Sequence, residues 1–228
     1  MASSVALASA GAHVFLLARS GAELHELATA IAAAGGKASA QVGDVLDRPA
    51  TAKFIAANGP FDILVNNAGT NRPAPLVDTA DTDIDAVFNL NVLAAFNVAR
   101  EVARGLIAAK RSGSIINVSS QMGHVGGPGR TVYCATKHAL EGMTKALAWE
   151  LGPLGIRVNT LCPTFIDTPM TASMLADGDF RKSVVERIAL GRIGEIEELM
   201  GPIVFLASDA SALMTGAALM VDGGWTAR

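Results

Sequence analysis

The stretch SIINVSSQMGHVGGPGRTVYCATK, residues 114–137, contains an apolar run, a glycine-rich loop and a helical segment in that order. The apolar run lies within 112–119 and shows little alternation of polar and apolar residues, which is typical of a strand buried on both faces of a sheet. Ser120 ends this strand, while Tyr133 and Lys137 stand four residues apart and so share one face of the following helix. Since the loop can fold back, the stretch predicts a hydroxyl, a phenol and an ammonium together at the carboxyl edge of a sheet.

The same succession of a short apolar strand and a helix runs along the whole chain. Strands are predicted at 13–18, 37–43, 61–66, 112–119, 156–162 and 217–223, and helices at 20–34, 47–57, 79–109, 131–152 and 195–208. This alternation predicts a doubly wound α/β fold with a parallel sheet and right-handed crossovers. No linker interrupts it, so residues 1–228 are interpreted as a single domain. The less regular segment 168–193 is predicted to form a helical lid over the carboxyl ends of the strands, where ligands bind in such sheets.

Composition argues against several classes of protein. The chain has 228 residues, a formal net charge of −3 and no basic cluster of the kind that nucleic acid requires. No apolar run reaches the roughly 18 residues of a membrane-spanning helix. Two cysteines, Cys134 and Cys162, are too few for a disulfide framework and are interpreted as reduced thiols. We therefore expect a cytoplasmic protein without nucleic-acid or membrane partners, and no histidine, cysteine and carboxylate spacing predicts a metal.

The three polar residues of the opening stretch match the Ser…Tyr-x-x-x-Lys pattern of the short-chain dehydrogenase/reductase family. Three further blocks agree in the same order. DILVNNAGTN (62–71) resembles the family's Asn-Asn-Ala-Gly segment, NLNVLAAF (89–96) places Asn91 at its helix-interior asparagine, and 191–224 is similar to its C-terminal block. The resemblance implies a Rossmann-like fold and the NAD(P)-dependent interconversion of a secondary alcohol and a ketone.

The expected catalytic residues are Asn91, Ser120, Tyr133 and Lys137. A tyrosine with a pKa of about 10 exchanges protons poorly at neutral pH, and a nearby cation favours the phenolate, so Lys137 is expected to lower the pKa of Tyr133. Ser120 is expected to donate a hydrogen bond to the substrate oxygen. By resemblance, Asn91 would hold a water that relays protons from Lys137. Taken alone, the Tyr-Lys pair fits a weak surface contact on a helix, but the accompanying blocks favour catalysis.

Arg19 directly follows the first predicted strand, where an arginine suits the 2′-phosphate of NADP and a carboxylate would suit NAD. NADP is therefore favoured, and NAD is the alternative. Asp44 has a second interpretation, as a cap for the helix 47–57. By resemblance, the cofactor would contact Arg19, Asp44, Val45, Asn67, Ala68, Gly69, Tyr133, Lys137, Pro163, Ile166 and Thr168.

Several nearby residues have other or less certain roles. Asn66 is expected to brace the sheet. Thr164 stands where the family has glycine, and its β-branched side chain disfavours positive φ, so we expect a local backbone different from the family's. His124 and Arg130, in the loop before the predicted helix, are interpreted as solvated residues, with a substrate contact as the alternative.

The chain departs from the family pattern at its start. MASSVALASAGAHV (1–14) resembles the end of the helix that follows the family's first strand and glycine-rich loop, and both of these are absent. Because such a loop and helix N-terminus bind the pyrophosphate, the chain as given is expected to bind a dinucleotide weakly. The missing strand would lie between 13–18 and 61–66. Either the natural chain is longer, which we favour, or the chain is stable as given, with 13–18 shifted to pair with 61–66 or with its region rearranged.

The C-terminal block is similar to family members that act on sugar acids and polyols, such as gluconate 5-dehydrogenases, which favours such a substrate. The alternative enzyme is a 3-oxoacyl thioester reductase. The alternative class is a cofactor-incompetent protein that keeps the fold and acts in binding or assembly. The resemblance also implies a homotetramer, in which the helices 79–109 and 131–152 form one interface and the C-terminal region another.

Overall fold

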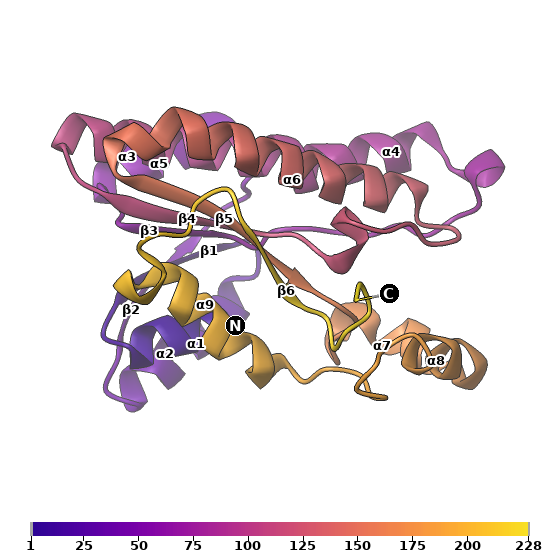
Figure 1. Cartoon of the computed structure of the whole chain (residues 1–228). Helices are drawn as coiled ribbons and strands as arrows, with labels where there is room; N and C mark the ends of the chain where they lie inside the picture. Colours follow the sequence, from indigo (N-terminus) through magenta and orange to yellow (C-terminus); the bar gives the residue numbers. More distant parts are fainter. Residues whose placement is uncertain (1, 228) are drawn as a thin grey trace.

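The computed structural model describes residues 2–227, in which helices cover both faces of parallel strands (Figure 1). The strands are β1 (His13–Ala18), β2 (Lys37–Val42), β3 (Ile63–Asn66), β4 (Gly113–Val118), β5 (Ile156–Pro163) and β6 (Ala218–Val221). The helices are α1 (Ala2–Ser9), α2 (Gly21–Ala33), α3 (Arg48–Asn58), α4 (Asp81–Phe88), α5 (Ala95–Ala109), α6 (Thr131–Leu151), α7 (Pro169–Leu175), α8 (Gly178–Val185) and α9 (Met200–Ala207). One layer holds α3 to α6 and the other holds α1, α2 and α9 (Figure 1), which confirms the predicted doubly wound α/β fold.

The strands form two parallel sheets. One contains β1 and β2, paired from His13–Lys37 to Ala18–Val42, and the other has the order β3-β4-β5-β6. Within residues 2–227, no backbone ladder joins β1 to β3. The alternative that 13–18 pairs with 61–66 is therefore wrong.

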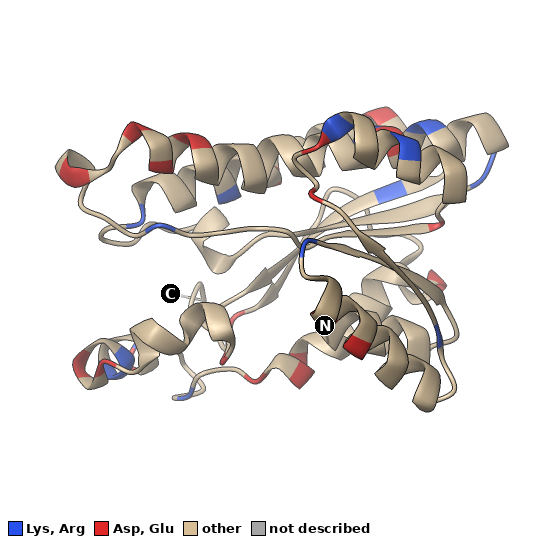
Figure 2. Ribbon diagram, turned by 180° about the vertical axis from the view of Figure 1, so that it is seen from behind, with Lys and Arg blue, Asp and Glu red and all other residues tan. Residues whose placement is uncertain are grey.

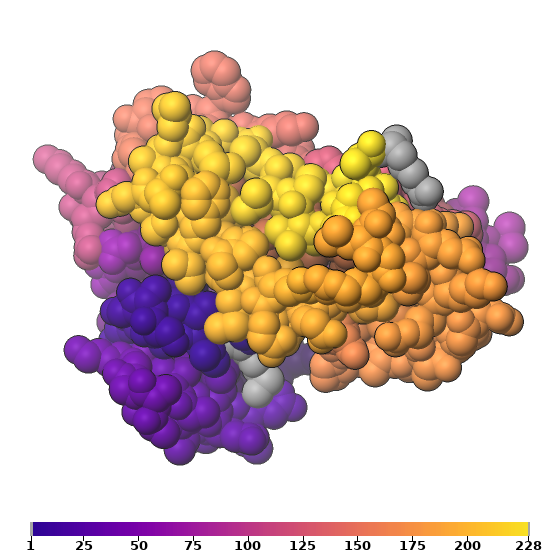
Figure 3. Space-filling view, turned by 60° about the horizontal axis from the view of Figure 1, so that its bottom comes forward, coloured from indigo at the N-terminus to yellow at the C-terminus, as the bar shows by residue number. Residues whose placement is uncertain are grey.

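Side chains join the two sheets where backbone hydrogen bonds do not. The ring of Phe15 in β1 meets the ring of Phe61, which lies two residues before β3, edge to face with the centroids 5.1 Å apart. Phe54 of α3 lies against both rings. On the other face, Leu7 of α1 packs in one cluster with Ile116 of β4. Figure 3 shows α1, in indigo, lying beside the α9 region, so the first helix of the chain covers both sheets.

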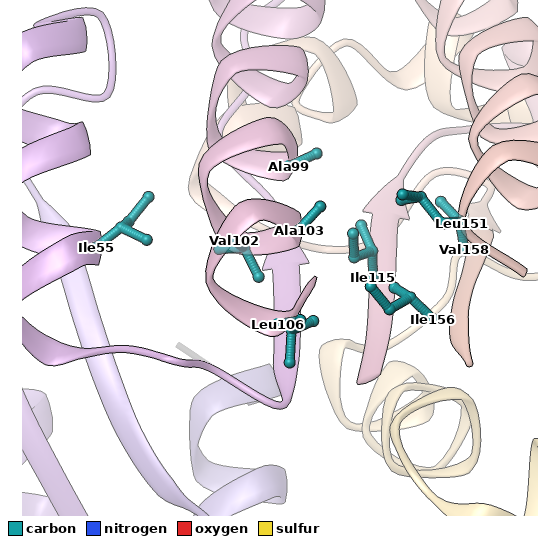
Figure 4. Packing of buried hydrophobic residues seen from close by; sticks show 9 residues of the cluster. All are labelled: Ile55, Ala99, Val102, Ala103, Leu106, Ile115, Leu151, Ile156 and Val158. Atoms are coloured by element: carbon teal, nitrogen blue, oxygen red, sulfur yellow. The ribbon is translucent and has the colours of Figure 1, made fainter. Parts of the chain in front are cut away.

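The largest apolar cluster fills the space between the upper helices and the four-stranded sheet (Figure 4). Its members are Ile55, Ala99, Val102, Ala103, Leu106, Ile115, Leu151, Ile156 and Val158. Leu106, Ile115 and Ile156 have no exposed surface. Since full burial of one such side chain stabilises a fold by about 1.5–3 kcal/mol, this cluster holds β4, β5 and α6 rigidly together. These are the elements that carry Ser120, Pro163 and Tyr133.

The long helix predicted at 79–109 is interrupted. A π-helical turn, Asn89–Ala94, separates α4 from α5, and such turns often occur at functional sites. The predicted lid at 168–193 is helical and contains α7 and α8. The helix predicted at 195–208 begins with a 3-10 turn, Ile196–Leu199, before α9. The helical character of the first residues, which the resemblance implied, is present as α1.

Charged residues of both signs are interspersed along the helices in the view from behind (Figure 2). Of the helices in the described part of the chain, none combines the length and the apolar character needed to cross a bilayer.

Candidate active site

Ser120 follows β4 and is held in one orientation. It is 6% exposed, and its extended backbone precedes the 3-10 turn Gln121–Gly123. The hydroxyl donates to Oε1 of Gln121 across 2.7 Å and accepts from the amide of Met122 across 3.1 Å. The carbonyl oxygen of Pro163 lies 3.5 Å away, so the ends of β4 and β5 meet at this hydroxyl.

Tyr133 lies in the first turn of α6, and its hydroxyl is close enough to Ser120 for a hydrogen bond between them to act on its pKa. The side chain is half-buried. Burial raises the pKa of Tyr133, and a hydrogen bond with Ser120 and the positive charge of Arg130 oppose this rise only in part. The loss of hydration outweighs the nearby charges, so the net shift is upward, and Lys137 is not among the groups that cause it. The expected influence of Lys137 on this pKa stays a prediction.

Lys137 lies one turn further along α6 and is 5% exposed. Its Nζ donates to the carbonyl oxygen of Val118 across 2.8 Å and lies 5.4 Å from the centroid of the Tyr133 ring. The ammonium thus faces the ring of the tyrosine and the end of β4. Burial lowers the pKa of Lys137 to about 8, against the opposing influence of Cys162 and Glu141.

Asn91 is 1% exposed and belongs to the π-helical turn. Its amide nitrogen donates to the carbonyl oxygen of Thr70 and to Oγ1 of Thr136, at 2.9 and 3.1 Å, and its Oδ1 accepts from the amide of Thr70 at 2.8 Å. A Cβ on Gly69 would stand 3.3 Å from Oδ1 of Asn91 and 3.9 Å from Nζ of Lys137. Asn91 therefore ties the loop after β3 to α6. Its expected contact with a proton-relaying water stays a prediction.

The residues expected near the adenosine lie at the carboxyl ends of β1, β2 and β3. Arg19, Asn67 and Ala68 are exposed there, and Gly69 is half-buried. Asn66 donates to the Ala95 carbonyl oxygen and to Oδ1 of Asn117, which confirms that it braces the sheet.

Asp44 accepts a hydrogen bond from the amide of Leu46 across 2.9 Å. Its interpretation as a helix cap is wrong, because Asp47 caps α3 by accepting from the amide of Ala50 across 3.0 Å. Val45 lines a neighbouring cleft of about 240 Å³. The other lining residues are Leu46, Arg48, Asn89, Leu93, Ala94 and Asn97.

The segment after β5 carries the residues expected near the nicotinamide. Pro163 is half-buried and ends β5, and Ile166 is 6% exposed and forms an isolated parallel bridge with Gly194. Thr168 begins α7 in a reciprocal cap with Thr171, whose hydroxyl donates to the carbonyl oxygen of Ile166 across 2.6 Å. These bonds fix the direction in which the segment leaves the sheet.

Thr164 has a negative φ, as expected for a β-branched residue. Its Oγ1 is buried and has no hydrogen-bond partner among the described residues. Thr164 and Ile166 line a cavity of about 410 Å³ that lies against β6 and the segment 188–194. Ser120, Tyr133 and Lys137 are not among the residues that line this cavity.

The lid packs directly on the polar cluster. Tyr133 and Cys134 lie against a group of buried apolar residues drawn from the lid, the loop after β4 and the C-terminus. The members of this group are Met122, Phe165, Leu175, Val184, Ile188, Ile193 and Trp225. The predicted position of the lid over the strand ends is confirmed.

His124 is not only a solvated loop residue. Its Nε2 lies 3.5 Å from Sγ of Cys162 and 3.5 Å from Oε1 of Glu141, and the three side chains bring potential metal-ligand atoms within 4.8 Å of one another. No local sequence pattern indicates this group, because its members come from a loop, a strand and a helix. Burial raises the pKa of the Cys162 thiol to about 12, and both cysteines are free, as expected.

Arg130 also differs from its interpretation as a solvated residue. It is 7% exposed, and its Nη2 lies 3.0 Å from Sδ of Met174 in α7. Its Nη1 is buried without a hydrogen-bond partner among residues 2–227. Burial lowers the pKa of Arg130, while the nearby Tyr133 and Cys134 oppose this change.

Together these groups can transfer a proton to an oxygen atom held at the strand ends. Ser120 offers a fixed hydroxyl, and Tyr133 offers a proton that burial keeps in place at neutral pH. Lys137 places positive charge behind the ring of the tyrosine. The arrangement matches the order and spacing that the sequence predicted for Ser120, Tyr133 and Lys137.

Comparison with known proteins agrees with this geometry. The family model described as "Enoyl-(Acyl carrier protein) reductase" matches residues 1–226. L-xylulose reductase of Bos taurus is 40% identical over 222 residues, which are 97% of this chain and 89% of that protein. Gluconate 5-dehydrogenase of Gluconobacter oxydans is 41% identical over 224 residues, covering 96% of this chain and 87% of the relative.

A solved structure is also similar over the full length of the chain. The gluconate 5-dehydrogenase from Burkholderia cenocepacia, solved in complex with NADP and tartrate, superposes with a TM-score of 0.94 at 36% identity. The match covers 100% of this chain and 90% of that one. Fold, polar cluster and relatives together define an oxidoreductase of the doubly wound α/β class. The chain belongs to the short-chain dehydrogenase/reductase family.

Proposed function

We propose that the protein interconverts a secondary alcohol and a ketone of a sugar acid or polyol, with NADP as the cofactor. The convergence of Ser120, Tyr133 and Lys137 carries this proposal, because these groups supply oriented hydrogen bonding, a proton and positive charge at one edge of the sheet. The names of the relatives, a xylulose reductase and gluconate dehydrogenases, support a polyhydroxylated substrate.

Each group has a proposed role in ketone reduction. Ser120 donates a hydrogen bond to the carbonyl oxygen, which holds the carbonyl and stabilises the charge that develops on it. Tyr133 transfers its hydroxyl proton to this oxygen, and the oxidation of the alcohol follows the same path in reverse. A bound nicotinamide supplies or accepts the hydride. Lys137 and Asn91 position the tyrosine helix against the strand ends, and we propose that Asn91 also helps to return a proton from solvent.

The residues at the strand ends fit a dinucleotide. Arg19 is exposed and forms no ion pair within residues 2–227, so its guanidinium is available for the 2′-phosphate of NADP. The unpartnered hydroxyl of Thr164 offers a polar contact next to Ile166. Asp44, Val45, Asn67, Ala68 and Gly69 would then line the adenosine, and Pro163, Ile166 and Thr168 the nicotinamide, as the family resemblance implied.

An assay of the chain tests the proposal directly. Purified protein is incubated with NADP or NADPH and a panel of sugar acids, ketoses, polyols and 3-oxoacyl thioesters, and the absorbance of reduced nicotinamide is followed. We expect turnover with the polyhydroxylated compounds, and its loss in Tyr133→Phe. Turnover of thioesters alone would favour the alternative reductase. Absence of both dinucleotide binding and turnover would favour the alternative of a cofactor-incompetent protein that acts in binding or assembly.

We further propose that the protein works in the cytoplasm as a homotetramer. Apolar side chains on the outer layer support an assembly surface, because Phe96 and Ile107 of α5 are each 44% exposed and Trp149 of α6 is 88% exposed. Light scattering of the purified chain measures the number of protomers. A monomer over a wide range of concentrations would contradict the assembly.

A further inference from the structure

Arg130 is a buried cation that its surroundings leave without a counter-ion. Only 7% of the residue is exposed, and none of the ion pairs among residues 2–227 includes it. One end of its guanidinium touches only the sulfur of Met174, which is a weak acceptor, and the other end has no acceptor. Burying a charge without partners is strongly unfavourable, so a side chain kept in this state needs a reason.

A second arginine in the same chain shows what a structural guanidinium looks like. Arg157 of β5 donates to Oγ of Ser211 and to the carbonyl oxygens of Leu206 and Ser208, at distances of 2.9 to 3.1 Å, with a longer contact to the Met214 carbonyl oxygen. The protein itself therefore supplies oxygen acceptors for the guanidinium of Arg157. The guanidinium of Arg130 has no oxygen acceptor among residues 2–227.

The position of Arg130 points to the substrate. Arg130 immediately precedes α6 and stands three residues before Tyr133, which lies in the first turn of that helix. Its charge acts on the Tyr133 hydroxyl. On its other side, Met174 belongs to α7 of the lid. The side chain of Arg130 therefore reaches from the start of α6, where Tyr133 lies, to α7 of the lid.

We propose that Arg130 binds the carboxylate of the substrate, so that the protein acts on polyhydroxy acids in preference to neutral polyols. A carboxylate presents two oxygens that match the planar fork of a guanidinium and supplies the missing negative charge. This inference rests on the proposed oxidoreductase function and assigns the substrate class within it. Arg130 would anchor the acid end of the molecule, while its reacting carbon lies at Ser120 and Tyr133.

A matched pair of compounds tests the inference by kinetics. D-Gluconate and D-gluconamide differ only in the charge at one end, and each is oxidised with NADP by the wild type, Arg130→Met, Arg130→Lys and the control Arg111→Met. Arg111 pairs with Asp62 on the surface, far along the sheet from the site. We expect the wild type to favour the acid in kcat/KM by about 10- to 150-fold, which is the value of hydrogen bonds to a charged group.

In Arg130→Met the preference for the acid should fall to near one, and in Arg130→Lys it should be intermediate because the charge remains but the fork is lost. Arg111→Met should keep the full preference. Equal losses for acid and amide in Arg130→Met would overturn the inference, because they would show a structural role. A wild type that does not distinguish the two compounds would also overturn it and would leave the proposed function intact.

A binding measurement makes the test independent of turnover. The thermal midpoint of each variant is measured with and without D-gluconate. Arg130→Met should be at least as stable as the wild type, since it removes an unpaired buried charge, whereas Arg157→Met should melt several degrees lower because it empties a satisfied site. Gluconate should raise the midpoint of the wild type and leave that of Arg130→Met unchanged.

The outcomes separate the two proposals. Stabilisation by gluconate that depends on Arg130, without turnover, would support the carboxylate site and contradict the proposed reaction. Arg130→Met that melts like Arg157→Met, or a gluconate effect that is equal in wild type and variant, would overturn the carboxylate site. The carboxylate site would also be overturned if neither gluconate nor shorter and longer sugar acids changed the thermal midpoint of the wild type.

Discussion

Nζ of Lys137 donates a hydrogen bond to the carbonyl oxygen of Val118 across 2.8 Å, and this bond fastens the helix of Tyr133 to the strand that leads into Ser120. The bond is made by a buried ammonium whose pKa burial lowers to about 8. The same side chain therefore aligns the site and weakens the fold that holds it.

The burial of the Lys137 ammonium should make the stability of the fold depend on pH. The pKa of Lys137 lies near 8 in the folded chain and near 10.5 in the unfolded chain, so between these values the unfolded state binds more protons and the free energy of unfolding rises with pH. Below pH 8 the buried charge costs about 3 kcal/mol. Lys137→Met should therefore be more stable than the wild type at pH 7 by roughly 2 kcal/mol, after loss of the bond to Val118.

The gain in Lys137→Met should shrink as pH rises from 8 to 10.5, and catalytic activity should be lost throughout. Urea unfolding across this range measures it. Lys145→Met, which removes an exposed lysine from the same helix, should show no such trend. A constant stability difference across the range would contradict the buried-charge explanation.

The second prediction concerns the hydroxyl of Tyr133. Tyr133→Phe keeps the ring that packs against the lid and removes only the group that exchanges the proton, so kcat should fall by about 10² to 10⁴-fold. The free energy of unfolding should change by less than about 1 kcal/mol. Steady-state kinetics and urea unfolding provide the two measurements. Thr131→Ala, in the exposed first turn of α6, should keep its activity, and a Tyr133→Phe protein with undiminished kcat would exclude this tyrosine as the proton donor.

The third prediction concerns the amide of Asn91. Asn91→Ala leaves the amide and carbonyl of Thr70 without their partners in a buried setting, so we expect a loss of about 2–4 kcal/mol in the free energy of unfolding. Asn97→Ala serves as the control, because that side chain bonds only to Leu93 one turn earlier in the helix, and it should lose about 1 kcal/mol. Chemical denaturation measures the free energy of unfolding of both variants. Equal losses would show that the hydrogen bonds of Asn91 between the loop after β3 and α6 contribute little to stability.

The fourth prediction concerns cofactor choice. Arg19→Ala removes the unpaired guanidinium at the end of β1, so the ratio of NADPH to NADH affinity should fall by about 10- to 150-fold. Binding of NADH should stay nearly constant. Lys53→Ala, which removes an exposed cation from α3, is the matched control. Fluorescence titration with both dinucleotides gives the ratio, and an unchanged ratio would remove Arg19 from the phosphate site.

Sequence reasoning located the fold and the polar cluster well because both depend on short local patterns. The strand of 112–119 and the pair Tyr133 and Lys137 are fixed by buried apolar runs and by helical spacing. The burial of these side chains and its effect on their pKa values could not be predicted from such local patterns. The burial that raises the pKa of Tyr133 comes from the lid and the loop after β4.

The misjudged residues share one cause. His124 and Arg130 lie in a loop rich in glycine, which suggested solvent exposure. Arg130 is instead buried against α7, while His124 is exposed as expected but also contacts Cys162 of β5. Glu141 gave no signal at all, because its neighbours Cys162 and His124 come from other parts of the chain. Likewise, the π-helical turn at Asn91 depends on bonds to Thr70, twenty-one positions away. Long-range contacts of this kind have no local signature.

Within the described residues 2–227 no backbone ladder joins the two sheets, and side chains connect them where Phe15 meets Phe61. A backbone ladder opens cooperatively, but an interface of rings can part without breaking any strand pairing. The unit of β1, β2 and α2 should therefore open as one block while β3 to β6 stay closed. In native-state hydrogen exchange, the amides of β1 and β2 should lose their protection together, at a lower free energy of opening than the amides of β4 and β5. The N-terminal unit that carries Arg19 should therefore be the less stable part of the fold.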